Sequence, residues 1–227
     1  ERFLTKEKIL GLLLAALCHD AGHDWFEQEA QMSMSSNALL SRYCSFNEVD
    51  HCLNAISVIS RGDCNPLNKI SPSQSRPIFE YVIELILSTD MSLHFTILNE
   101  FSNLVNSGQF DPDESQPHKL LLMKVLIKCA DLAVMARPFD VARKNFDFVT
   151  EEFYRKGDIE RCDGIVFIGA DQKREDIDKK ASFVGFAKNV ALPLFQTLGK
   201  QISLLSSPAD QIKENISKYQ AQKDLKK

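Results

Sequence analysis

Residues 9–20 read Ile-Leu-Gly-Leu-Leu-Leu-Ala-Ala-Leu-Cys-His-Asp, an apolar run that ends abruptly at an imidazole and a carboxylate. A second apolar run, from Leu120 to Ala130, is interrupted only by two lysines and ends at Asp131. Helices that are apolar around their whole circumference lie in the interior of a bundle. We therefore expect two central helices, each of which leads into an acidic residue.

The rest of the chain also shows helical periodicity. Glycine is scarce, with 9 in 227 residues, and apolar residues recur at helical spacing in most windows. The predicted fold class is all-α, a compact multi-helix bundle. The expected helices are 5–20, 37–43, 47–61, 74–88, 90–106, 118–136, 138–156, 179–206 and 208–222, with a possible extended segment at 165–168.

Composition excludes several classes of function. The net charge of −4 and pI of about 5.8 provide no basic field, so a nucleic acid is not an expected partner. Six scattered cysteines without a CxxC pair favour reduced thiols and a cytoplasmic location. The longest apolar run is about half the length that a membrane span needs. A first residue of Glu1 suggests a fragment of a longer chain.

The acids at the two helix ends need compensation. A carboxylate that enters a core is costly unless a cation or a metal ion balances it, and no Arg or Lys is obviously placed to do so. In one interpretation, His19, Asp20 and Asp131 share a divalent ion. Imidazole with carboxylates suits zinc, manganese or iron, and a harder ion such as magnesium could join at the carboxylates. In the other interpretation, His19 caps the C-terminus of a helix, and the acids accept hydrogen bonds from backbone amides.

His23 lies four residues after His19, which would place both on one face of a continuing helix. The spacing is that of the zincin HExxH pattern, but the second position is Asp20, and Gly22 interrupts the helix. A metalloprotease is therefore not expected. His23 is either a loop histidine or a donor to a metal ligand or bound water.

With these residues in place, the chain resembles the class I 3′,5′-cyclic nucleotide phosphodiesterase catalytic domain, an all-helical member of the HD-type metal phosphohydrolases. The resemblance rests on several blocks in the family's order, and it covers about residues 3–220. The blocks are LLLAALCHDAGH at 12–23, EVDHC at 48–52, ILSTDMSLHF at 86–95, KCADL at 128–132 with Arg137-Pro138, EFYRKGD at 152–158, and VGF at 184–186 with Pro193-Leu194.

The resemblance implies a two-metal hydrolase of cyclic nucleotides. His19, Asp20 and Asp131 would bind a first ion, usually zinc, and Asp20 would bridge to a second, usually magnesium, with manganese an alternative. Water ionised between the ions would attack phosphorus in line and yield a 5′-nucleotide. Three further residues would act in catalysis by orienting ligands and metal-bound waters: His23, Glu48 and Asp90.

The resemblance also implies a substrate pocket and partners. The residues expected to contact the cyclic nucleotide are Met91, Leu132, Phe183 and Phe186, with Phe186 as the aromatic clamp over the base. Another expected partner is an upstream regulatory region of the same chain, and a second copy in a homodimer or larger assembly stays open. The preference between cAMP and cGMP stays open. The predicted domain spans 1–222, and 223–227 would be a frayed charged tail.

The sequence departs from the family pattern at several positions. The HNxxHAxDV segment, which supplies a fourth metal ligand and the general acid, would lie just before residue 1. Asp50 replaces the first histidine of the family's ExHH segment, and Phe183 stands where a glutamine reads the purine edge. Phenylalanine can form no such hydrogen bond, although it could equally be part of a repacked core. The chain is therefore either a divergent phosphodiesterase or a catalytically weakened copy with a structural or regulatory role.

Overall fold

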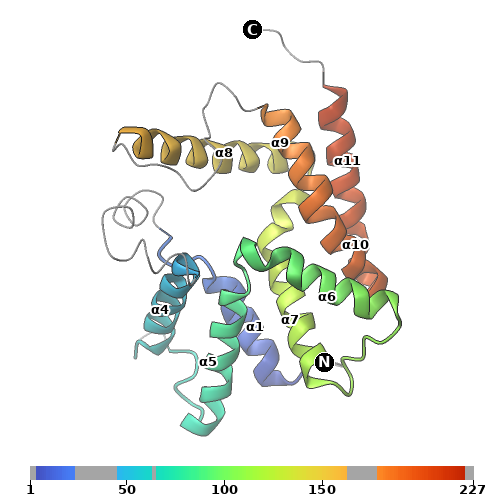
Figure 1. Cartoon of the computed structure of the whole chain (residues 1–227). Helices are drawn as coiled ribbons and strands as arrows, with labels where there is room; N and C mark the ends of the chain where they lie inside the picture. The colour runs from blue at the N-terminus through green and yellow to red at the C-terminus, as the bar shows by residue number, and fades with distance from the viewer. Residues whose placement is uncertain (1–3, 24–44, 63–64, 163–177, 223–227) are drawn as a thin grey trace. The chain divides into compact units, whose positions relative to one another are not determined.

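The computed structural model describes residues 4–23, 45–62, 65–162 and 178–222 (Figure 1). Every regular element in these ranges is helical, so the all-α prediction is confirmed. The chain divides into two compact units. The first combines Glu1–His23 with Leu39–Asp131, and the second combines Asp24–Ala38 with Leu132–Lys227.

The first unit contains both apolar runs. Its elements are α1 (Lys6–Cys18), α4 (Phe46–Ser60), α5 (Pro72–Leu87), the short 3₁₀ helix η1 (Met91–Leu93), α6 (His94–Asn106) and α7 (Gln116–Asp131). Helix α1 lies along α5, as Figure 1 shows. The approach is close because Gly11 has no side chain, and a Cβ at Gly11 would lie 2.9 Å from Cβ of Tyr81.

The two apolar helices differ in their burial. Helix α7 is an interior helix, as expected, with buried side chains at Leu121, Leu122, Met123, Val125, Ile127, Lys128 and Cys129. For α1 the prediction was wrong, because Leu13 is 62% exposed and Leu17 is 83% exposed. The physical reason is that α1 buries only the face that carries Gly11 and Ala15. An apolar circumference permits burial on every side, but packing partners must supply it.

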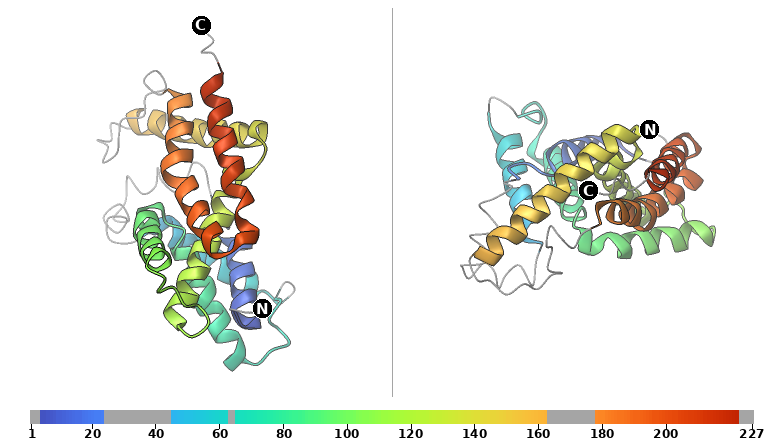
Figure 2. Two further views of the ribbon diagram at one scale, coloured as in Figure 1. Left: turned by 90° about the vertical axis from the view of Figure 1, so that its right-hand side faces the viewer. Right: turned by 90° about the horizontal axis from the view of Figure 1, so that it is seen from above.

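The second unit holds the C-terminal helices. Its elements are η2 (Leu132–Ala136), α8 (Phe139–Cys162), α9 (Lys179–Phe186), the π-helical turn η3 (Ala187–Ala191), α10 (Leu192–Gln201), the 3₁₀ turn η4 (Ser203–Leu205) and α11 (Ser207–Ala221). Helices α10 and α11 lie side by side, as both views of Figure 2 show.

Two expected helices are shorter or less regular than predicted. The helix expected over 118–136 is α-helical only to Asp131 and continues as η2. The helix expected over 179–206 contains a π turn, in which Leu192 N–H donates to Ala187 O, and it ends at Gln201. Pro193 explains the π turn, because proline has no N–H and its ring clashes with an α-helical carbonyl one turn earlier.

Helix α11 is joined to η2 by a buried amide. Asn215 Nδ2 donates to the carbonyl oxygens of Met135 (3.0 Å) and Arg137 (2.8 Å), and Gln211 Nε2 donates to Asn215 Oδ1 at 3.1 Å. Both amide protons and the side-chain oxygen of the buried Asn215 therefore have hydrogen-bond partners. Ile212 is fully buried on the same helix.

Three predicted segments lie outside the described residues: the helix over 37–43, the extended piece at 165–168 and the tail at 223–227. Within the described ranges, no single helix has the length and apolar character to cross a membrane. The pair Pro72–Leu87 and Met91–Asn106 meets the length and composition test only when joined, and it bends by 80° at the break.

Candidate metal centre

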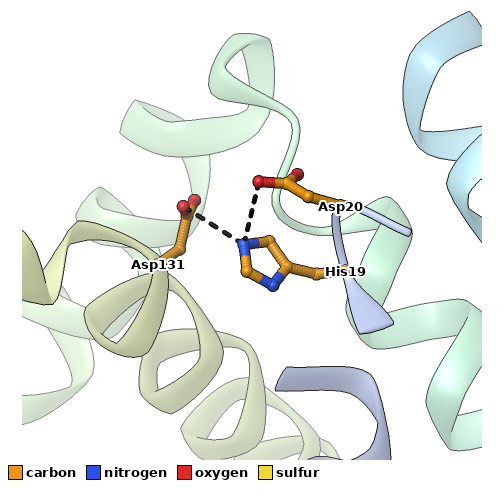
Figure 3. A group of neighbouring side chains, drawn as sticks. All are labelled: His19, Asp20 and Asp131. Carbon is orange, nitrogen blue, oxygen red and sulfur yellow. Dashed lines mark ion pairs between the residues drawn. The ribbon is translucent and has the colours of Figure 1, made fainter. Parts of the chain in front are cut away.

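His19 is the C-cap of α1, and its two ring nitrogens have different surroundings. Nδ1 lies 3.0 Å from the carbonyl oxygen of Ala16. Because a carbonyl can only accept, Nδ1 carries a proton, and Nε2 is the ring nitrogen that would bind an ion once its own proton is released. Nε2 lies 3.4 Å from Asp20 Oδ2 and 3.4 Å from Asp131 Oδ1 (Figure 3). Helix capping and convergence with the two acids therefore occur together in the same side chain.

The spacing of these three groups fits a common ion. One ligand atom from each of His19, Asp20 and Asp131 lies within 4.8 Å of the other two. Ligands bound at about 2.1 Å in a tetrahedral site are about 3.4 Å apart, which is the separation of Nε2 from both carboxylates. The hydrogen bond with Asp131 raises the pKa of His19 to about 9, against the effect of burial and with further help from Asp20.

His51 lies on the other side of Asp20 and was given no role from the sequence. It is buried, its Nδ1 lies 3.7 Å from Asp20 Oδ1, and its ring meets that of His23 edge-on at 5.5 Å. Among the described residues, neither ring nitrogen of His51 has a hydrogen-bond partner. Buried polar atoms are rarely left unpaired, so the ring nitrogens of His51 have bonding capacity that a water molecule or a ligand would use. The only sequence signal was its place as the retained histidine of EVDHC.

Glu48 and Asp90 lie close to the triad but have opposite pKa shifts. Burial raises the pKa of Glu48, and the negative charges of Asp90 and Asp20 raise it further. At Asp90 burial also acts to raise the pKa, but hydrogen bonds from Ser45 Oγ and from Ser92 outweigh it and the pKa falls. The Ser92 N–H donates to Asp90 Oδ1 at 2.7 Å. Asp90 is therefore held as a carboxylate, whereas Glu48 holds a proton more readily.

A buried cation lies beside these acids, although none was evident from the sequence. Lys128 is 1% exposed, and its charge interacts with those of Asp131, Asp90 and Glu48. Burial is the largest influence and lowers the pKa of Lys128. The fold thus supplies part of the compensation that the acidic cluster requires.

The turn after His19-Asp20 depends on glycine. Gly22 has φ of +76°, and a Cβ at this position would lie 2.5 Å from Asn54 Nδ2. Asn54 Nδ2 in turn donates to Asp50 Oδ2 at 2.8 Å. Because α1 ends at Cys18, His19 and His23 do not share a helix face, which removes the geometric basis of the zincin pattern.

The residues expected to contact substrate lie in different surroundings. Met91 is exposed on η1, and Leu132 is buried at the start of η2. Phe183 is fully buried, with its ring edge-on to those of Phe146 (5.2 Å) and Tyr219 (4.9 Å). These contacts favour the core interpretation of Phe183. Phe186 is partly exposed and lies 6.3 Å from the Phe146 ring.

The fold and the triad together define an all-helical protein with a candidate His-Asp-Asp metal centre. The sequence model of the 3′5′-cyclic nucleotide phosphodiesterase family matches residues 1–212. The chain therefore belongs to the 3′,5′-cyclic nucleotide phosphodiesterase family, as the resemblance predicted. Membership implies divalent metal cofactors.

Several relatives and solved structures are similar to the chain. It is 31% identical over 202 residues to the high affinity cGMP-specific 3′,5′-cyclic phosphodiesterase 9A of Mus musculus, covering 88% of this chain and 37% of that protein. It is 32% identical over 199 residues to the cGMP-specific 3′,5′-cyclic phosphodiesterase of Drosophila melanogaster, covering 87% of this chain and 18% of that protein. The chain thus spans well under half the length of these relatives.

The phosphodiesterase domain of the Salpingoeca rosetta rhodopsin phosphodiesterase has the same fold, with a TM-score of 0.86. The two sequences are 24% identical, and the alignment covers 96% of this chain and 67% of the other.

Proposed function

We propose that this chain forms the metal-binding part of a catalytic domain that hydrolyses 3′,5′-cyclic nucleotides to 5′-nucleotides. The observation that carries the proposal is the convergence of His19 Nε2 with one carboxylate oxygen each from Asp20 and Asp131. Family membership supplies the reaction class. Because relatives at 31–32% identity are named as cGMP-specific, cGMP is the first substrate to test.

His19, Asp20 and Asp131 would hold the first ion, with zinc as the proposed metal because the set joins an imidazole to two carboxylates. Asp20 would extend to a second ion, proposed as magnesium or manganese, since its Oδ1 faces away from His19 toward His51. Bound divalent ions would neutralise phosphate charge and acidify a bound water.

The surrounding residues would manage water and protons. Asp90, a hydrogen-bonded carboxylate, would accept hydrogen bonds from ordered water, and the raised pKa of Glu48 would let it take up a proton. His23 and His51 meet beside Asp20 and would orient that carboxylate and its waters.

The substrate contacts form a separate part of the proposal. Met91 and Phe186 are exposed or partly exposed and would contact the nucleotide, Phe186 through its aromatic face. Leu132 would shape the site from its buried position at the start of η2. A role for Phe183 in binding the base requires that its ring leave its contacts with Phe146 and Tyr219.

The context of the domain is also proposed. Residues 1–222 would form one catalytic domain, joined to a regulatory region and able to form a homodimer. A cytoplasmic location is supported by free thiols at Cys18, Cys52 and Cys129. Burial raises the pKa of Cys52 to about 11 and that of Cys129 to about 12, so both remain unreactive thiols.

A second candidate function has one specific observation in its favour. The position expected to read the base is Phe183, which lies in an aromatic cluster rather than on an open surface. A phosphodiesterase-like domain that has lost base recognition could serve as a structural or regulatory module while keeping its metal centre.

One experiment separates the two candidates. The full-length protein is loaded with zinc and magnesium, its metal content is measured by elemental analysis, and hydrolysis of cGMP and cAMP is followed. Asp131→Ala should lose both metal and activity, whereas Asp113→Ala, an exposed loop acid, should keep both. A wild type that binds metal but hydrolyses neither nucleotide would favour the structural candidate, and a wild type that binds no metal would refute the first proposal.

A further inference from the structure

The ammonium of Lys128 is fully engaged by backbone carbonyls. Nζ donates to the carbonyl oxygens of Ser88 (3.0 Å), Thr89 (3.1 Å) and Asp90 (3.1 Å). A lysine ammonium has three protons, so these three bonds use its whole donor capacity. The acceptors are consecutive residues in the turn that follows α5, where helix carbonyls would otherwise lack partners.

The same turn is closed from within. Ser88 Oγ donates to Leu85 O and Thr89 Oγ1 donates to Ile86 O, both at 2.7 Å. Ser88 and Thr89 are themselves buried. The backbone of the turn is thus fixed by side chains on one side and by Lys128 on the other.

Asp90 ends this turn, and its carboxylate is fixed as well. Oδ1 accepts the Ser92 N–H and Oδ2 accepts the Ser45 hydroxyl. Lys128 lies three residues before Asp131 on α7, so the two share a helix face. One buried side chain therefore links the helix that carries Asp131 to the turn that carries Asp90.

We propose that Lys128 is a positioning residue for Asp90: its ammonium holds the turn Ser88–Asp90 against α7, so that Asp90 keeps a fixed place relative to Asp131. The proposal rests on the proposed function in one respect, namely that Asp90 serves water around a bound ion. The charge of Lys128 also interacts with three acids. A role through charge alone, however, would not require three carbonyl partners from a single turn.

The first test needs neither metal nor substrate. Lys128→Met keeps an apolar stem and removes the ammonium, and Lys124→Met removes the same charge one helical turn earlier, where the lysine pairs with Glu84. Hydrogen exchange of the Ser92 amide reports the turn directly. It should accelerate at least about tenfold in Lys128→Met and stay near wild type in Lys124→Met. Unchanged exchange in Lys128→Met would overturn the proposal.

The second test is a double-mutant cycle that measures Mn²⁺ affinity. It is measured at the site of the second ion, which is held less tightly than the first. Lys128→Met should weaken binding about tenfold when Asp90 is present, a size typical of groups that orient ligands. In an Asp90→Asn background it should cause no further weakening. Tighter binding in both backgrounds would assign Lys128 a charge role only, and equal weakening in both would indicate a general structural role. Either result overturns the proposal.

Failure of the proposed function gives a different outcome. If the wild type binds no Mn²⁺ and hydrolyses no cyclic nucleotide, the proposed function fails, while faster Ser92 exchange in Lys128→Met alone would still establish the positioning role. If Lys128→Met does not fold, Lys128→Gln, which removes the charge but retains two amide donors, undergoes the same tests with intermediate changes expected.

Discussion

Replacing Phe183 by glutamine tests whether this position belongs to the core or to a substrate pocket. The ring is fully buried and meets two aromatic neighbours edge-on, Phe146 and Tyr219. Each such pair contributes about 0.5–1.5 kcal/mol beyond simple burial. Glutamine also places an amide among these rings, and an unsatisfied buried polar group costs about 1–3 kcal/mol. Together these losses predict that Phe183→Gln lowers the free energy of unfolding by about 2–6 kcal/mol.

The assay is chemical and thermal denaturation followed by circular dichroism, with two matched controls. A loss of 2–6 kcal/mol corresponds to a fall in Tm of about 4–24 °C for a chain of this size. Phe183→Leu removes the ring without adding an amide and should cost less than Phe183→Gln. Phe186→Gln, at a partly exposed position on the same helix, should cost less than about 1 kcal/mol.

The opposite result would refute this reasoning. Suppose that Phe183→Gln is as stable as Phe183→Leu and binds cGMP or cAMP more tightly than the wild type in calorimetric titrations. The side chain at 183 would then face the nucleotide, and the amide would be satisfied by the base. The aromatic contacts with Phe146 and Tyr219 could not be the state that binds substrate.

Three further predictions concern the metal centre and its turn. Asp131→Ala should abolish retention of the tightly held ion, whereas Asp90→Ala should reduce metal affinity by about 10–100-fold, as elemental analysis and Mn²⁺ titration would show. Because the pKa of His19 is raised to about 9, a proton competes with the ion for Nε2, so Mn²⁺ affinity should rise about tenfold per pH unit between pH 6.5 and 8.5; a flat profile would exclude His19 as a ligand. Gly22→Ala should destabilise the chain by about 1–3 kcal/mol more than Gly108→Ala in denaturant melts, since both glycines have positive φ but only Gly22 is crowded.

The sequence predicted much of the fold because helical periodicity depends on neighbours within the same segment. The sequence-based prediction failed where the burial of a helix depends on a packing partner from elsewhere in the chain. Helices α1 and α7 are similarly apolar in sequence, yet only α7 is enclosed, while Leu13 and Leu17 of α1 are exposed. Nothing in residues 9–18 specifies which of its faces another helix will cover.

The same distinction holds in the candidate site. The triad could be predicted because burying a carboxylate at the end of an apolar helix costs free energy unless a cation or a metal ion balances its charge. Lys128 could not, since it and Lys124 are both lysines within one apolar run. Lys124 pairs with Glu84 and stays partly exposed, whereas the buried Lys128 donates hydrogen bonds to carbonyls about 40 residues earlier in the chain. His51 was missed for the same reason, because its position beside Asp20 depends on how α4 packs.

The charges of the assembled cluster bear on the number of ions. Asp20, Glu48, Asp90 and Asp131 supply four carboxylates, and Lys128 supplies one ammonium. Bound cations favour the ionised form of every acid in the cluster, Glu48 included, so with His19 neutral the residues carry three net negative charges. One divalent ion would leave a net negative charge, which repels a cyclic phosphate. Two divalent ions would leave one positive charge, which matches the single negative charge of a phosphodiester. The electrostatics of the residues in the first unit therefore support the two-ion form of the proposal over a single-ion site.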